Sequence, residues 1–263
     1  MNMRISVLTC IVTSIFGWSA CKSKENFGQL ENIYGDDSRK TLSKMPPFGS
    51  VGRLSNGCTM FMVGPRIALT AAHCAAIEVN TLTVELHADE KGTRMNMQVL
   101  ERGINLQERK ILNQEYDGNI SENDWAILLM TDGFSNSCFD VSSALSEGEQ
   151  LVVAGYSADF ISRHGGLPGV SKGCTAHIAN NWIEHSCDVT GGGSGGPVSV
   201  FRGEKYVAVG LNSFSARVGS KINYDRPDKN TYEIATRISP RVVEKINRYN
   251  LKYNGYSSPE CNK

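Results

Sequence analysis

The sequence lacks an excess of charge of either sign, because 27 lysine and arginine residues balance 27 aspartate and glutamate residues among 263. It has no basic or acidic tail, so we expect neither nucleic acid nor an anionic membrane face as the main partner. The CxxC and HxxxH spacings typical of metal sites are also missing, and we expect no metal and no cofactor. These absences leave an ordinary globular chain, long enough for one large domain or two small ones.

The sequence also has little sign of a transmembrane helix. The uncharged, largely apolar run Ile5–Trp18 is shorter than the roughly 20 residues that such a helix needs. It follows Arg4 and precedes Ser19-Ala20, which predicts a signal peptide over residues 1–20 and an exported protein. Ser19-Ala20-Cys21 resembles the end of a bacterial lipoprotein cleavage box, so Cys21 is a candidate for lipidation and membrane attachment. Cleavage nearby by an ordinary signal peptidase is the alternative.

Eight cysteines are present, and one of them, Cys10, lies in the predicted signal peptide. If Cys21 is lipidated or lost, six remain in the mature chain. An even number of cysteines in an exported protein favours disulfide bonds over metal ligation. The count alone leaves their pairing open.

Short apolar and β-branched runs follow one another along the chain, separated by turn residues. This spacing favours all-β barrels or sandwiches, with the polar residues 131–150 connecting two halves. The expected strands are 49–54, 58–63, 67–70, 81–86, 95–100, 125–130, 151–155, 172–178, 198–201, 206–211 and 232–238.

One helix is predicted, near the C-terminus. Ser239 is a suitable N-cap residue, and Pro240 is favoured at the first helical position. We expect its apolar face to pack on the domain rather than to bind a partner. Four residues make up this face: Val242, Val243, Ile246 and Tyr249.

A single serine lies within a run of five glycines in the stretch Gly191–Pro197. Glycine allows the chain to turn sharply, to project the Ser194 hydroxyl and to aim backbone N–H groups at one point. These are the requirements of an acyl-transfer nucleophile with an oxyanion hole. Taken alone, the run is more typical of a flexible hairpin or linker.

Two upstream segments carry residues of catalytic type. Leu69–Cys74 places His73 at the end of an apolar strand, and Asn123–Leu128 places Asp124 at the start of another. A neutral imidazole can take the proton of a serine hydroxyl, and a carboxylate can orient that imidazole. The order His73, Asp124, Ser194 therefore indicates nucleophilic catalysis, and it differs from the order Ser, Asp, His of an α/β-hydrolase esterase.

Three segments, in this order, resemble those of the chymotrypsin-like serine endopeptidases: LTAAHC (69–74), NDWAIL (123–128) and GGGSGGPV (191–198). The resemblance covers about residues 33–250. Residues 33–39, 58–59 and 63–66 are similar to the bacterial branch that includes the glutamyl endopeptidases. The resemblance implies an all-β fold of two six-stranded antiparallel β-barrels, with the active site in the cleft between them.

The resemblance and the strand pattern together predict how the chain is divided. Residues 21–47 are expected to be a polar tether or pro-segment. An N-terminal β-barrel is expected over residues 48–140, and a C-terminal β-barrel with the helix over residues 141–250. Residues 251–263 are expected to form a polar tail.

The resemblance implies that Ser194 is the nucleophile, His73 the general base and then acid, and Asp124 the carboxylate that orients it. The backbone N–H groups of Gly192 and Ser194 would form the oxyanion hole. Ser213 falls where the family has a residue that supports the aspartate and pairs with the substrate backbone. Its neighbours complete the expected substrate-binding stretch: Asn212, Phe214 and Ser215.

The resemblance also implies three disulfide bonds. One braces the catalytic histidine, one flanks the specificity pocket, and the third joins the two cysteines that remain. They are, in this order, Cys58–Cys74, Cys174–Cys187 and Cys138–Cys261.

Two departures from the family bear on function. Gly193 stands where vertebrate trypsins have an aspartate that receives the new amino terminus after activation, so this ion pair cannot form and any activation takes another route. Asn212 stands where glutamyl endopeptidases have a histidine, so we do not expect strict specificity for glutamate.

The resemblance also bears on P1, the substrate residue before the cleaved bond. Counted back from Ser194 without gaps, Asp188 falls where trypsin-like enzymes have a pocket-floor carboxylate, and Glu233 aligns with a neighbouring wall. Buried negative charge would favour arginine or lysine at P1. The alternatives are that Asp188 is a loop or capping residue and that Glu233 points outward, with a preference for glutamate or for many residues.

The leading prediction is an exported serine endopeptidase that acts on a protein or peptide substrate as a monomer. The alternative is a non-catalytic binding or adhesion module on the same fold, whose usual sign is the loss of a triad residue, and none is missing here. The remaining histidines lack a motif and are expected at the surface or in loops: His87, His164, His177 and His185.

Overall fold

The computed structural model describes residues 31–34, 36–75, 81–87, 89, 92–104, 122–179, 182–217 and 231–255. The predicted signal peptide, Cys21 and most of the predicted tail lie outside these residues. Within the described ranges, no helix is both long enough and apolar enough to cross a membrane.

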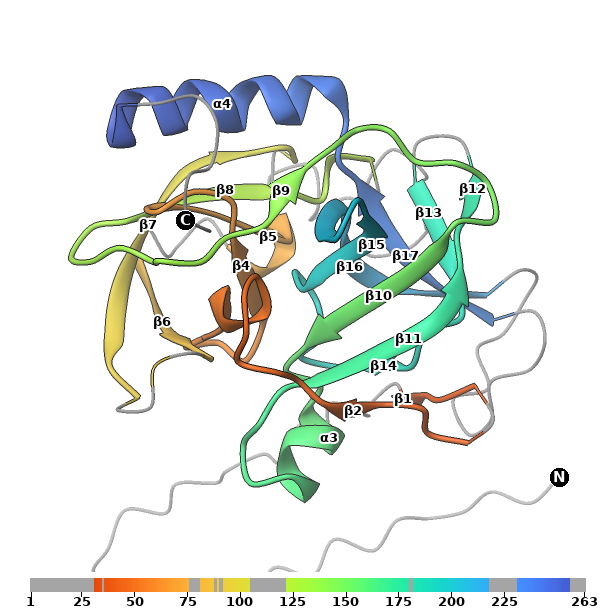
Figure 1. The fold of residues 1–263 in the computed structure, drawn as a ribbon. Helices are drawn as coiled ribbons and strands as arrows, with labels where there is room; N and C mark the ends of the chain where they lie inside the picture. Colours follow the sequence, from red (N-terminus) through yellow and green to blue (C-terminus); the bar gives the residue numbers. More distant parts are fainter. Residues whose placement is uncertain are drawn as a thin grey trace, which may run out of the picture.

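Six strands of the first half close into a barrel, as predicted (Figure 1). Around the barrel they follow the order β3, β4, β5, β8, β7, β6. Every residue of β4, β5 and β8 is buried, which explains why these strands read as unbroken apolar runs. The strands are β3 (Val51–Leu54), β4 (Thr59–Met62), β5 (Ile67–Thr70), β6 (Thr81–Leu86), β7 (Arg94–Arg102) and β8 (Ala126–Met130).

The second half forms a sheet of nine strands, of which six are the main ones. Five of the main strands overlap the ranges expected from the sequence, and the sixth, β13, was not among those ranges. Three short strands are added, and one of them, β9, pairs with β16 in parallel. The main strands are β10 (Gln150–Gly155), β11 (Gly169–Thr175), β13 (Trp182–His185), β15 (Pro197–Arg202), β16 (Lys205–Arg217) and β17 (Thr231–Arg237). The short ones are β2 (Lys40–Thr41), β9 (Asp140–Val141) and β12 (His177–Ala179).

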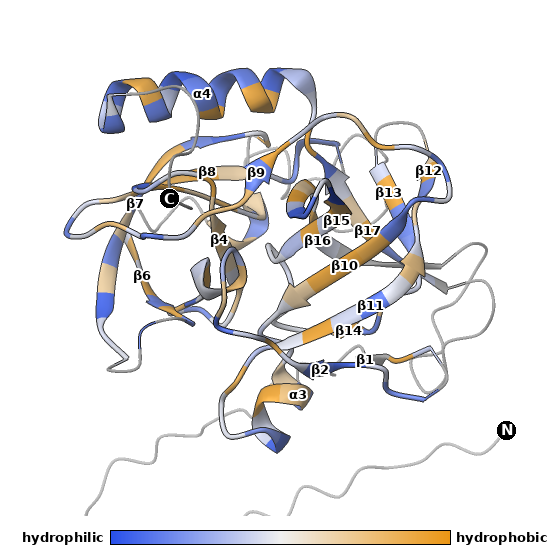
Figure 2. Ribbon diagram, viewed as in Figure 1, coloured by the Kyte–Doolittle hydropathy of each residue, from blue (hydrophilic) through white to orange (hydrophobic). Residues whose placement is uncertain are grey.

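The predicted helix is α4 (Pro240–Asn254), and its polar and apolar residues alternate along the ribbon (Figure 2). The Ser239 side chain accepts a hydrogen bond from the Val242 N–H, and the helix ends where Gly255 adopts a left-handed φ of 83°. The fully buried Asn250 donates to the backbone oxygen of Val63 at 3.0 Å. The helix therefore follows the second sheet in sequence but lies on the first barrel.

The core consists of two clusters of buried apolar residues. The larger one fills the first barrel and continues through Val152, Ala154 and Leu211 of the second sheet to Ile246 of α4. The smaller one lies within the second sheet and includes Ile183. Because the larger cluster spans both halves, the two parts of the chain share one packed interface.

Residues 31–34 and 36–42, which we call the strap, lie along the second sheet beside α3 (Ala158–Arg163) (Figure 1). Strand β1 (Glu31–Asn32) pairs with β14 (Val189–Thr190), and β2 pairs with β11. Arg39 and Leu42 are buried. The polar residues of the strap bind partners far along the chain, which does not fit a free tether over these residues; the pro-segment alternative stays a prediction. The short helix α3 was not predicted.

Candidate active site

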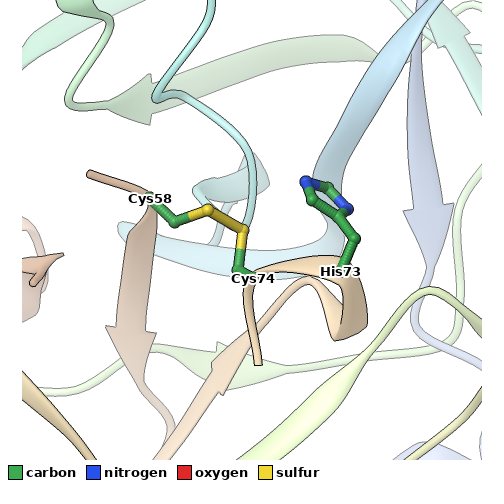
Figure 3. A group of neighbouring side chains, drawn as sticks. All are labelled: Cys58, His73 and Cys74. Carbon is green, nitrogen blue, oxygen red and sulfur yellow. A yellow bond between two sulfur atoms is a disulfide. The ribbon is translucent and has the colours of Figure 1, made fainter. Parts of the chain in front are cut away.

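His73 is held at the end of β5 by a short turn. The chain leaves β5 at Thr70, whose hydroxyl donates to the backbone oxygen of Thr59 at 2.7 Å, and enters the 3-10 turn η2 (Ala72–Cys74). A disulfide between Cys58 and Cys74, with 6.0 Å between the Cα atoms, ties this turn to the start of β4 (Figure 3). His73 lies beside the bond in the same turn, so its backbone is fixed on both sides.

Asp124 lies just before β8, with 2% of its surface exposed. Its Oδ2 is 2.7 Å from His73 Nδ1, and its Oδ1 accepts the His73 backbone N–H at 2.9 Å. The Ser213 hydroxyl also donates to Oδ2. Burial alone raises the pKa of Asp124, but His73 and these hydrogen bonds outweigh it and lower the pKa below its usual value. The carboxylate is thus ionised at neutral pH and orients the imidazole.

Ser194 lies in residues 186–196, which we call the nucleophile loop. Its backbone oxygen accepts the Thr59 N–H of the first barrel at 2.9 Å. Its hydroxyl donates to the backbone oxygen of Ser213 at 3.2 Å, so Ser213 contacts both Ser194 and Asp124. The Ser194 hydroxyl makes no hydrogen bond to His73 in this arrangement; such bonds commonly tighten only when substrate binds. A chain of contacts from His73 through Asp124 and Ser213 to Ser194 therefore links the three predicted triad residues, where the two halves meet.

The nucleophile loop leaves two backbone donors available. The N–H of Gly193 donates to Thr190 at 2.9 Å, and that of Gly195 donates to Asn212 at 2.6 Å. Among the described residues, the N–H groups of Gly192 and Ser194 have no acceptor. These are the two donors predicted for the oxyanion hole, and an oxyanion needs donors that are not already used.

Thr59 is a site residue that sequence reasoning did not single out. Besides its backbone bond to Ser194, its hydroxyl donates to the Gly192 oxygen at 2.7 Å and accepts the Tyr156 N–H at 2.9 Å. A polar residue at the start of the wholly buried β4 was the signal available in the sequence. Thr59 thus fixes the nucleophile loop from the side of the first barrel.

The carboxylate of Asp188 is used within the protein. Asp188 is 3% exposed. Its Oδ1 accepts the Tyr34 N–H at 2.8 Å, and its Oδ2 accepts the Ser38 N–H at 2.8 Å and the Ser38 hydroxyl at 2.5 Å. These bonds fit the alternative in which Asp188 is a capping residue rather than the open floor of a specificity pocket. The groups that it caps lie in the strap.

The other expected substrate-binding residues lie on β16 and β17. Asn212 and Glu233 are buried, and Glu233 pairs across the sheet with His185, so the outward-pointing alternative for Glu233 is wrong. Phe214 and Ser215 belong to β16, and their side chains lie outside the described part of the structure.

Two of the remaining histidines, His87 and His185, are buried. His87 lies in the turn after β6, which agrees with the expected loop position, whereas His185 lies in β13, so the expectation of a surface or loop position is wrong for it. His185 is 2% exposed, and its Nδ1 accepts the Cys187 N–H at 3.3 Å. Within the described part of the chain, His185 Nε2 and Asn212 Oδ1 are buried without a hydrogen-bond partner. Burial lowers the pKa of His185 from 6.5 to about 4, and Asn212 opposes part of that effect.

This pKa predicts a pH-dependent stability. The unfolded chain binds a proton at His185 below about pH 6.5, whereas the folded protein does so only near pH 4. The stabilisation is present above pH 6.5 and is lost as the pH falls toward 4, by about 3 kcal/mol. When the free energy of unfolding is measured with urea at a series of pH values, it should depend less steeply on pH in the His185→Gln variant than in the wild type. The exposed His177, whose pKa is raised by Glu147, is the control, since His177→Gln should not reduce the slope. An unchanged slope in His185→Gln would contradict the prediction.

The predicted disulfides can be followed as far as the described residues allow. Cys174 and Cys187 are bonded, with 5.2 Å between their Cα atoms. Cys138 is also disulfide-bonded, but Cys261 lies outside the described residues, so their pairing stays a prediction.

Two groups of side chains bring a histidine beside two cysteines. In both groups the sulfur atoms are bonded to each other, so they offer no thiolate to a metal ion. The groups are Cys58, His73, Cys74 and Cys174, His185, Cys187.

Comparison with known proteins gives the family. The Trypsin family model matches residues 34–243. Among solved structures, the chain is similar to one described as the structure of Glu endopeptidase in complex with MPD, with 16% identity and a TM-score of 0.61 over 82% of this chain and 98% of that one. At this identity the likeness shows a shared fold. No curated protein matches the chain.

Proposed function

Because the chain belongs to the trypsin family of serine proteases, we propose that it is an exported serine endopeptidase whose acyl-enzyme forms on Ser194. The observation that carries this proposal is the contact of Asp124 with both His73 and Ser213, beside the Ser194 hydroxyl. Family membership supplies the reaction class, and these contacts support His73 as the base, Asp124 as its orienting group and Ser194 as the nucleophile.

The mechanism follows from the roles that these groups can play. Asp124 holds the proton of the His73 imidazole on Nδ1, which leaves Nε2 free to accept the hydroxyl proton of Ser194. Ser194 Oγ then bonds to the substrate carbonyl carbon, and the negative oxygen is bound by the N–H groups of Gly192 and Ser194. The C–N bond then breaks as His73 passes its proton to the leaving amine, and an ester remains on Ser194. Water loses a proton to His73 and attacks the ester carbonyl, and His73 returns that proton to Ser194 Oγ as the ester bond breaks.

A fluorophosphonate probe tests the proposal, because it reacts only with an activated serine. The purified, oxidised protein should form one adduct, located on Ser194, and the Ser194→Ala variant should form none. An unlabelled but correctly folded protein would instead favour the binding or adhesion module.

The oxyanion hole gives a prediction with a matched control. Gly192 has a φ of 96°, and a Cβ there would lie 2.5 Å from the Tyr156 oxygen, whereas a Cβ at Gly191 meets nothing within 4 Å. Gly192→Ala should therefore shift one donor and lower kcat by on the order of 10²–10³-fold. Gly191→Ala should stay near wild type. Steady-state kinetics on a peptide substrate, with melting temperatures for both variants, checks this; equal kcat values would contradict it.

The P1 preference stays a prediction. The hydrogen bonds from the strap to Asp188 support its role as a capping residue, so a preference for arginine or lysine depends on the buried Glu233. The alternatives are glutamate or a broad range at P1. A panel of P1-Arg, P1-Glu and P1-Phe peptides decides among them.

Export is supported by the family and by two disulfides, since such bonds persist in oxidising compartments. Family membership and these bonds indicate an extracellular location. Lipidation of Cys21 and a monomeric state stay predictions. Mass spectrometry of the mature N-terminus tests the first, and light scattering tests the second.

A further inference from the structure

Two groups of polar contacts join the strap to the nucleophile loop. In the first group, Asp188 receives two backbone N–H groups and one hydroxyl from Tyr34 and Ser38. The backbone N–H of Asp188 itself donates to the Ser171 hydroxyl of β11 at 3.0 Å. A carboxylate that accepts several N–H and O–H groups forms short, charge-assisted hydrogen bonds. The start of the loop is thus tied to the strap and to the sheet beneath it.

The second group centres on Arg39, which is 8% exposed. Its Nη1 donates to Asp159 at 2.8 Å, and Asp159 also accepts the Thr190 hydroxyl of the nucleophile loop. Asp37 binds the other edge of the guanidinium, with 2.8 Å between Nε and Oδ1, and Arg163 contacts both carboxylates. Two positive and two negative groups therefore neutralise one another where strap, α3 and loop meet.

The charges of this second group are held firmly. Burial disfavours a charged Arg39, but its bonds to Asp37 and Asp159 outweigh that effect and raise its pKa above the usual value. Burial likewise raises the pKa of Asp159, but Arg39 and Thr190 lower it well below the usual value. Arg39 and Asp159 are the buried members, and removing either one leaves a buried charge without its main partner, which is costly.

Both groups act close to the oxyanion donors. The Thr190 oxygen accepts the Gly193 N–H, and the Gly191 oxygen accepts the Ala158 N–H of α3 at 2.7 Å. One of these bonds holds the residue before Gly192 in the sequence, and the other holds the residue after it. The direction in which the Gly192 and Ser194 N–H groups point therefore depends on where Thr190 and Asp188 are held.

We infer that the strap is a positioning element for catalysis: Tyr34, Ser38 and Arg39 hold the nucleophile loop so that the oxyanion donors face the substrate carbonyl. This inference rests on the proposed function. The donors from Tyr34 and Ser38 are internal peptide N–H groups and a hydroxyl. The loop is therefore ordered without a newly formed amino terminus, which is consistent with glycine at position 193.

Substitutions in the full chain test the inference. Asp188→Asn keeps the shape but removes the charge, and Thr190→Val replaces the hydroxyl that binds Asp159 by a methyl group. Each should lower kcat by about 10- to 100-fold with little change in KM, because the oxyanion hole acts in the transition state. Ser38→Ala should have a smaller effect in the same direction. Asp140→Asn, which loses only a 3.4 Å contact with Lys205, is the control and should match wild type.

The readout separates positioning from general stability. Melting temperatures are measured for every variant, and a fall in kcat in variants that are folded at the assay temperature supports the inference. Wild-type kcat in both Asp188→Asn and Thr190→Val overturns it, as does a rise in KM with unchanged kcat. If Asp188→Asn does not fold, Thr190→Val and Ser38→Ala decide. A wild-type protein that takes up no fluorophosphonate overturns the proposed function, and the inference with it.

Intact mass of the labelled protein tests the second part of the inference. The labelled species should still carry residues that precede Tyr34, because no free amine at that point takes part in the contacts. Labelling confined to a species whose chain begins at Tyr34 or later would overturn this part, while leaving the proposed function in place.

Discussion

Replacing Ser194 by alanine is expected to lower kcat for peptide hydrolysis by about 10⁶-fold. The variant has no oxygen that can bond to the carbonyl carbon, so no acyl-enzyme forms. The oxyanion donors and the binding residues stay in place and leave a small residual rate above that of water. Initial rates on a fluorogenic peptide, measured at high enzyme concentration, give the ratio.

The control for this substitution is Ser199→Ala. Ser199 is buried in β15, and its hydroxyl donates to the Val152 oxygen at 3.0 Å. Its loss should cost about 1 kcal/mol of stability and leave kcat unchanged. If Ser194→Ala retained more than a few per cent of the activity, another group would have to be the nucleophile.

Asp124→Asn is expected to lower kcat by about 10⁴-fold while the protein stays folded. The amide is nearly the same shape as the carboxylate, but its NH₂ group can donate to His73 Nδ1. That bond favours the tautomer with the proton on Nε2, which cannot accept the Ser194 proton. His73 Nδ1 and Asp124 Oδ2 are 2.7 Å apart, so a change at this carboxylate acts on the imidazole through a direct hydrogen bond.

The measurement is kcat at neutral pH, with circular dichroism and a melting curve for folding. Asp132→Asn is the matched control, since Asp132 is exposed and contacts Asn96 at the surface. It should behave as wild type. A folded Asp124→Asn protein with kcat within tenfold of wild type would show that the carboxylate does not set the tautomer.

Local sequence patterns predict the strands whose ends are marked by turn residues. The predicted strands 67–70 and 81–86 coincide with β5 and β6. The prediction for 206–211 is too short, because β16 continues to Arg217 through its pairing with β17, a contact that local sequence does not reveal. The helix α3 was missed because it is only 6 residues long and is held by Arg39, more than a hundred residues away.

The residues of the candidate site likewise divide into those that local sequence predicts and those that it does not. Ser194, His73 and Asp124 were predicted because each lies in a motif of its own, and the order of the motifs along the chain carries the signal. The partners of Asp188 could not be predicted, because Tyr34 and Ser38 are 154 and 150 positions away, and the resemblance of residues 33–39 to the bacterial branch does not say what they contact. His185 is buried by strands that meet only in the folded chain.

The position of α4 has a consequence for the order in which the protein is completed during synthesis. Asn250 contacts Val63 and is packed tightly against Gly64, so the helix covers the barrel made from the first half of the chain. The strap does the reverse, since it is made early and binds strands made late. The strap and α4 therefore each pack on the half of the fold to which they do not belong in sequence. A chain made only as far as the connecting segment therefore carries a barrel without its cover, and the barrel is complete only once α4 is available.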